Sequence, residues 1–122
     1  MYVELVIQGA SYIGELESFS HWRPTEADIK DTKNADEMEA GIRIVLKEAT
    51  EAVIMIEHSD RESPEQEDPT IAILRMTGEE FHKAVEYLID EAQQAARTLL
   101  HPGIPTINMG YMVDRLNGAT NE

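Results

Sequence analysis

The chain has 122 residues and carries 24 Asp and Glu against 10 Lys and Arg, which gives a formal net charge of −14. Such an acidic protein repels nucleic acid and anionic lipid, and it attracts basic partners. The hydrophobic share of 42% argues against uniform disorder and predicts a single packed domain over residues 1–122. The chain has no cysteine, which excludes a disulfide framework, a thiolate metal site and a cysteine nucleophile.

No segment has the pattern of a secretory signal or a membrane span. Residues 1–13 lack a basic region followed by a long apolar run, and secretory signals need both. No stretch approaches the ~18 apolar residues that a spanning helix needs. We therefore expect a cytoplasmic protein without membrane contact.

Most of the first half is predicted to form strands. Residues 2–8 are rich in Tyr, Val, Leu and Ile, and residues 12–19 alternate loosely, which predicts a hairpin or one long bent strand. Residues 42–56 also fit a helical stripe, but their β-branched content favours two strands joined by a turn near residues 48–51. Residues 70–76 predict a further strand.

Two polar segments separate these strands. Residues 24–39 are rich in Asp and Glu, and we interpret them as a solvated connection with room for a short edge strand. Residues 57–68 hold six acids, one Arg and Pro64, and they are predicted to form a loop.

The clearest element is a helix over residues 77–100. Thr77 and Glu80 match a capping box, and apolar residues then repeat at helical spacing until Pro102. Residues 111–116 predict a short helical piece. The order predicts an α+β fold, with a four- to five-stranded antiparallel sheet followed by one long amphipathic helix and a short C-terminal helical piece.

Two patterns have features of metal sites, and neither meets the requirements. His82, Glu86 and Asp90 lie four residues apart on one stripe of the predicted helix. This stripe borders the apolar face, so we interpret it as a solvated flank. Residues 28–39 have acids at both ends of a calcium-loop spacing, but Lys33 replaces the required glycine. We expect no metal and no cofactor.

No catalytic motif is present. There is no glycine-rich phosphate loop and no nucleophile elbow. The carboxylates are too numerous to single out an acid/base pair, because environment decides which of them titrates unusually. The chain also lacks the basic stripe of a nucleic-acid-binding protein. We expect a non-catalytic protein that makes no direct contact with nucleic acid.

Several residues resemble the SecB export chaperones. The helix end at Arg97 and the following residues 98–109, with Gly103 and Pro105, look like the helix and Gly-x-Pro segment of that family. Residues 22–24, a Trp-Arg-Pro sequence, resemble its Trp-x-Pro entry to a second strand, which here would fall in residues 25–32. The resemblance implies a homo-oligomeric chaperone that binds unfolded clients along apolar grooves, formed by Phe19, Trp22 and exposed apolar residues of the sheet.

Two other functions fit the composition. Carboxylates on a compact body can mimic backbone phosphates, so the chain also fits an acidic inhibitor, of the kind phages encode, that blocks a basic groove on a host protein. A small-ligand-binding protein built on the sheet is the third hypothesis. In the first two cases the partner is a protein, either an unfolded client or a basic protein. The predicted partner-binding residues are Phe19, Trp22, Glu57, Asp60, Glu62, Glu65, Glu67 and Asp68.

Self-association is expected with all three functions. An open antiparallel sheet has to cover its edges, and pairing with a second copy is one solution. Residues 53–56 are apolar on both faces of their predicted strand. A second layer therefore has to cover them, either the helix or another subunit.

Overall fold

The computed structural model describes residues 1–30, 38–48, 50–101 and 103–119 and shows an α+β fold. The strands are β1 (Tyr2–Ile7), β2 (Ala10–Trp22), β3 (Glu39–Leu46), β4 (Glu51–His58), β5 (Ile71–Met76) and β6 (Thr106–Asn108). The helices are α1 (Glu26–Lys30), α2 (Gly78–Thr98) and α3 (Met109–Ala119). The predicted strands, the long helix and the C-terminal helical piece are confirmed.

The strands form one six-stranded sheet in the order β5-β4-β3-β2-β1-β6. Neighbours from β1 to β4 pair antiparallel, but β4–β5 and β1–β6 pair parallel. The expected four- to five-stranded antiparallel sheet is therefore wrong in both strand number and direction. Parallel neighbours need a long connection. Residues 59–70 provide this connection between β4 and β5. The other parallel pair joins β1, near the beginning of the chain, to β6, near its end.

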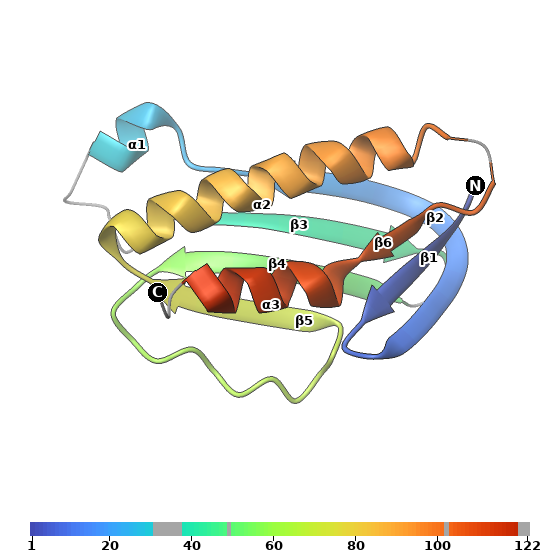
Figure 1. Cartoon of the computed structure of the whole chain (residues 1–122), viewed down its shortest axis with the longest axis horizontal. Coiled ribbons are helices and arrows are strands. Elements are labelled where there is room, and N and C mark those ends of the chain that lie inside the picture. The colour runs from blue at the N-terminus through green and yellow to red at the C-terminus, as the bar shows by residue number, and fades with distance from the viewer. Residues whose placement is uncertain (31–37, 49, 102, 120–122) are drawn as a thin grey trace.

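The sheet curls around α2 and α3, which lie on the same face (Figure 1). Every second residue of β1, Val3, Leu5 and Ile7, is buried against this helical layer. The matching stripe of α2 buries Phe81, Ala84, Val85, Leu88, Ile89, Ala92 and Ala95. The predicted helical period is confirmed, and the core lies between the sheet and the two helices.

The first two strands form both a hairpin and a long bent strand. Gln8 and Gly9 have positive φ angles of 48° and 86°, as a tight two-residue hairpin turn requires. β2 continues for 13 residues, and its register with β3 shifts between Leu16 and Ser18. The irregularity lets one strand pair with β1 at its beginning and with β3 at its end.

The polar segment after β2 begins with the short helix α1. The amide of Asp28 donates to the Thr25 hydroxyl (3.1 Å), and the amide of Thr25 donates to the Asp28 carboxylate (3.0 Å). These two bonds stabilise the first turn reciprocally. The helix occupies the place where the SecB resemblance predicts a second strand. Residues 31–37 of the predicted connection lie outside the described residues.

Helix α2 begins differently from the expected capping box. The Thr77 side chain makes no capping hydrogen bond. Instead, the amide of Gly78 donates to Nε2 of His58 (3.2 Å), at the end of β4. The imidazole also packs edge-on against Phe81, with ring centroids 5.0 Å apart. A residue twenty positions earlier therefore caps the helix, and local spacing does not reveal it.

We expect His58→Ala to lower the free energy of unfolding by about 2 kcal/mol, because it removes a helix cap and an aromatic contact together. Thr77→Ala is the matched control, and its effect should stay within about 0.5 kcal/mol. Urea denaturation of both variants measures the difference. A larger loss for Thr77→Ala than for His58→Ala would contradict the structure of this helix start.

Candidate functional site

The side chains that point away from α2 and α3 form what we call the helix-free face of the sheet. Strand pairing sets Gly41 between Trp22 and Met55, and Val53 between Arg43 and Ile71. Apolar side chains of this face occur on every strand from β1 to β5. They are Tyr2, Val6, Ile13, Trp22, Val45, Val53, Met55, Ile71 and Ile73.

Apolar side chains alternate with polar and charged ones on this face, although no helix covers it. Ile13 is 62% exposed, Tyr2 60% and Ile71 42%, whereas Ile42, Ile44 and the other large side chains beneath the helices are almost fully buried. The open face of a half-covered antiparallel sheet is normally polar. A contiguous exposed apolar surface in a folded domain usually marks an interaction site.

The two arginines of the helix-free face are paired locally. Arg43 forms an ion pair with Glu51, and Nε of Arg75 lies 2.9 Å from a carboxylate oxygen of Glu57. The Glu4 carboxylate accepts hydrogen bonds from the hydroxyls of Ser11 and Thr106, both 2.9 Å long. The face therefore presents apolar side chains beside ion-paired arginines and a hydrogen-bonded carboxylate.

Trp22 is held on this face by a glycine. Its indole lies over Gly41, where an added Cβ atom would lie 2.6 Å from Cη2 of Trp22 and 2.8 Å from the backbone oxygen of Ile54. Any side chain at position 41 would therefore displace the ring. The indole Nε1 is buried and makes no hydrogen bond with the described part of the chain.

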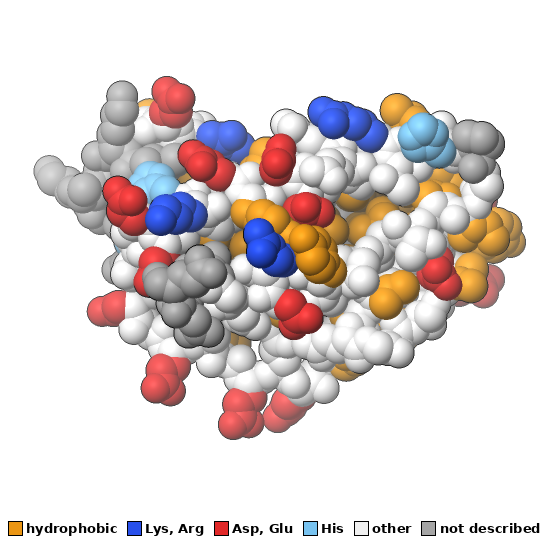
Figure 2. All heavy atoms as spheres, in the orientation of Figure 1, with side chains coloured by type: hydrophobic (Ala, Val, Ile, Leu, Met, Phe, Trp, Pro, Cys, Tyr) orange, Lys and Arg blue, Asp and Glu red, His pale blue; other side chains and the backbone are white. Residues whose placement is uncertain are grey.

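An acidic loop, residues 59–70, borders the face along the outer edge of β5 (Figure 1). The amide of Arg75 donates to the Ser63 hydroxyl and its guanidinium donates to the Glu62 carbonyl, both at 2.9 Å. These bonds hold the loop over an edge that would otherwise be free to pair with another strand. Figure 2 shows acidic side chains projecting along this border of the molecule.

Two hollows meet at Ile71, where the loop returns to the sheet. One has a volume of about 240 Å³ and is lined by residues 64–68 with Ile71 and Ile73. The other, about 350 Å³, is lined by Tyr12, Thr50, Glu51, Asp68, Thr70 and Ile71. Apolar floors beside carboxylates suit Lys and Arg side chains, which bury an aliphatic stem and keep the charge in water.

Asp68 lies between the two hollows and remains charged. The hydroxyl and amide of Thr70 both donate to its Oδ1, at 2.6 and 2.9 Å. These bonds lower the pKa of the Asp68 carboxyl below its ordinary value. Because the folded pKa is lowered, the bonds contribute at neutral pH and are lost as acid protonates the group.

The structure gathers most of the predicted partner-binding residues. Glu57 lies on the helix-free face beside β5, and the five acids of the loop follow the same border. Trp22 lies on that face too, but on β2, which is three strands away from β5. Phe19 pairs with Ile44 on the opposite, helix-covered face and packs against the core, so it is not brought to the others.

Sequence reasoning missed Tyr2, Ile13, Ile71 and Ile73 as surface residues. A signal was available in residues 71–74, where the residues on both faces of the strand are apolar. A single helical layer covers only one of these faces, so the other must stay at the surface. The predicted solvated flank of His82, Glu86 and Asp90 is exposed. Within the described residues, no group of three His, Cys, Asp or Glu is placed to hold a metal ion.

Comparison with protein-family models, curated proteins and solved structures finds no match to this chain. Of the helices that the structure describes, none combines the length and apolar character needed to cross a membrane. The function is therefore inferred from the helix-free face and its acidic border.

Proposed function

We propose that the protein is a non-catalytic binding module that holds apolar segments of other proteins, flanked by basic residues, on its helix-free face. One observation carries the proposal. Apolar side chains are exposed or half-exposed on five neighbouring strands, while the two arginines among them are ion-paired. Such a surface is costly to leave in water and gains free energy when a partner covers it.

The size of the face suits an extended polypeptide segment. Five strands spaced about 4.8 Å apart span about 19 Å, which matches about six residues of extended chain at 3.3 Å each. A segment that crosses the strands from Tyr2 to Ile71 would meet an apolar side chain on each of the five strands.

The acidic loop favours basic residues beside the apolar segment. Its five carboxylates are exposed and Arg61 is the single basic residue among them. With a net charge of −14, the protein attracts cationic partners from a distance, which accelerates encounter more than it tightens binding.

The SecB resemblance supports the same kind of activity. It implies a homo-oligomer that binds unfolded clients along apolar grooves, and we include both properties in the proposal. A second copy that covers part of the helix-free face would compete with a client. The oligomer is therefore expected to dissociate or rearrange when a client binds.

We expect charged substitutions on the helix-free face to weaken binding of a fluorescein-labelled peptide with an apolar centre and lysine at both ends. Ile13→Glu and Ile71→Glu should each raise the Kd about tenfold, because burying an isoleucine contributes about 1.5–3 kcal/mol. Fluorescence anisotropy measures the Kd. Ile13 is 62% exposed and Ile71 42%, and neither belongs to the core, so neither variant should unfold.

Leu100→Glu is the matched control for these variants. Leu100 is 84% exposed but follows the end of α2, outside the helix-free face. Its Kd for the peptide should equal that of the wild type. Equal weakening by Leu100→Glu, or no peptide binding by the wild type, would reject the proposal.

The acidic inhibitor remains a second candidate, favoured by the row of exposed carboxylates along the loop. The same assay separates the two functions. If Glu65→Gln and Glu67→Gln abolish binding while Ile71→Glu has no effect, the loop acts as a phosphate mimic. If binding persists at about 1 M salt, where charges are screened beyond about 3 Å, the apolar face carries it.

A further inference from the structure

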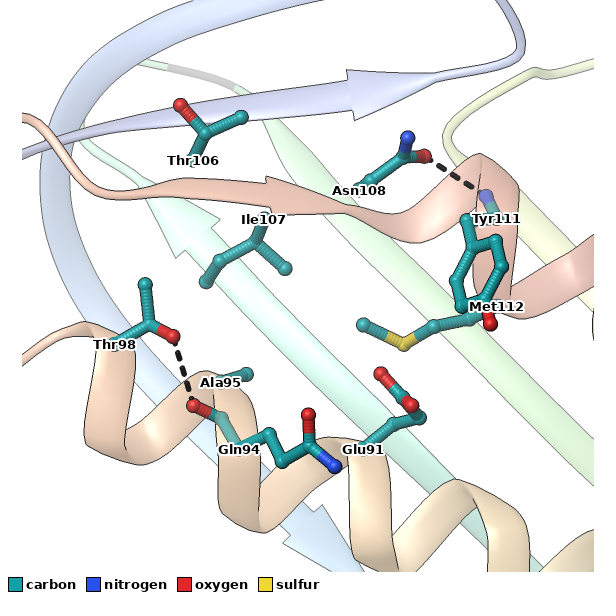
Figure 3. A pocket seen from close by; sticks show the side chains of 9 residues that line it. All are labelled: Glu91, Gln94, Ala95, Thr98, Thr106, Ile107, Asn108, Tyr111 and Met112. Carbon is teal, nitrogen blue, oxygen red and sulfur yellow. Dashed lines mark hydrogen bonds between the residues drawn. The ribbon is translucent and has the colours of Figure 1, made fainter.

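A hollow of about 130 Å³ lies on the helical side of the molecule, between α2, β6 and α3. Figure 3 shows the side chains that line it. They are Glu91, Gln94, Ala95, Thr98, Thr106, Ile107, Asn108, Tyr111 and Met112. This hollow is separate from the helix-free face and does not depend on its proposed role.

Glu91 supplies a negative charge to the hollow and interacts electrostatically with the neighbouring Tyr87. Its carboxylate is half-buried and points from α2 toward α3 and the space between them (Figure 3). It makes no hydrogen bond or ion pair with any residue that the structure describes. Arg115 of α3 lies instead over the ring of Tyr87, 5.6 Å from its centroid. A half-buried carboxylate of this kind favours a cationic partner.

The wall opposite Glu91 is the free edge of β6. The amide of Glu4 donates to the carbonyl of Pro105 (2.9 Å). Because backbone groups alternate along a strand, those of Thr106 then point away from β1. The side-chain oxygen Oδ1 of Asn108 accepts from the backbone amide of Tyr111 (2.8 Å), which fixes the start of α3 and the position of the tyrosine. The edge of β6 therefore adds the backbone carbonyl of Thr106 as an acceptor, and the start of α3 adds the ring of Tyr111 as a fixed wall.

The floor of the hollow is apolar, formed by Ala95, Ile107 and Met112. We propose that this site binds a primary alkylammonium group of about four carbons, either a free small amine or a lysine side chain, with the ammonium at Glu91. An alkyl chain would cover the apolar floor. An ammonium has three donors, which suit the carboxylate, the Gln94 amide oxygen and the edge carbonyl.

Other cations fit less well. A quaternary ammonium is recognised by several aromatic walls, whereas Tyr111 is the single aromatic residue that lines the hollow. A guanidinium prefers a bidentate carboxylate in an open plane. An apolar cavity of about 150 Å³ holds benzene, so a hollow of 130 Å³ suits a ligand of about five heavy atoms, the size of butylammonium.

The test is titration of the full chain with n-butylamine hydrochloride, followed by two-dimensional NMR. We expect saturable shifts confined to α2 after Tyr87, β6 and α3, with a Kd in the millimolar range that such a small ligand allows. Glu91→Gln should raise the Kd about tenfold, since it removes a charge-assisted hydrogen bond. A lysine derivative blocked at both its α-amino and carboxyl groups gives the second arm.

Glu79→Gln is the control, because it removes the same charge at the far end of α2. Butanol controls for apolar binding, and butylguanidinium tests the headgroup. Binding of the amine, of the lysine derivative or of both supports the site. Binding of only one of them identifies whether the ligand is a free amine or a lysine side chain. Equal binding of butanol, equal loss in Glu79→Gln, or no saturable shift would overturn the proposal without affecting the helix-free face.

Discussion

Leu88→Asp is expected to unfold the protein. Leu88 is fully buried at the centre of the apolar stripe of α2, on the side of the helix that faces the sheet. Loss of the leucine alone costs about 2–5 kcal/mol, and an unpaired carboxylate at the same place adds several more. Together these approach the total stability of about 5–15 kcal/mol that a domain has. Far-UV circular dichroism at neutral pH should show loss of the helical signal.

The control for Leu88→Asp is Gln93→Asp, which places the same residue on the exposed side of α2. It should retain the wild-type spectrum and change stability by about 0.5 kcal/mol at most. A folded Leu88→Asp variant of native stability would show that this side of α2 does not face the core.

Gly41→Ala is the second substitution with a large expected effect. The new Cβ atom would lie 2.6 Å from the Trp22 ring and 2.8 Å from the backbone oxygen of Ile54. The ring can move, but the backbone of β4 is paired on both sides, so we expect a loss of about 2 kcal/mol from overpacking. Trp22 is the only tryptophan in the chain. Its fluorescence should therefore shift to longer wavelength as the displaced indole becomes more exposed.

Gly118→Ala is the matched glycine variant. Gly118 lies in α3, and an added Cβ atom meets nothing within 4 Å. Because alanine favours a helix, this variant should gain up to about 1 kcal/mol and keep the wild-type emission. If Gly41→Ala were as stable as wild type with unchanged emission, Trp22 would not lie over position 41.

The elements that the sequence predicted correctly are those whose pattern is local. Residues 77–100 repeat apolar residues at helical spacing, and α2 buries that stripe. In residues 42–56 the β-branched residues outweighed a competing helical stripe, and the turn falls between Leu46 and Glu51 as expected. The cap of α2 and the position of β6 depend on partners far away in sequence, so no local pattern reveals them.

The candidate site was predicted in its charged part and at Trp22. Acids in residues 57–68 stand out in composition, and the structure gathers them along β5. Most of the apolar part was hidden. Alternation shows that Val53 and Met55 lie on one face of the strand and Ile54 and Ile56 on the other, but it does not show which face the helices cover. The helices cover Ile54 and Ile56 and leave Val53 and Met55 half-exposed, so cover of these two by another subunit stays a prediction.

The pairing of β1 with β6 has a consequence for synthesis on the ribosome. Glu4 and Thr106 are direct neighbours across 102 positions of the chain, and contacts of such long sequence separation form slowly. The β1–β2 hairpin can form as soon as it emerges, but β1 lacks its second neighbour, and the core lacks α2, until nearly all the described residues have been made. The nascent chain therefore exposes the apolar side of its strands until α2 and β6 have been made.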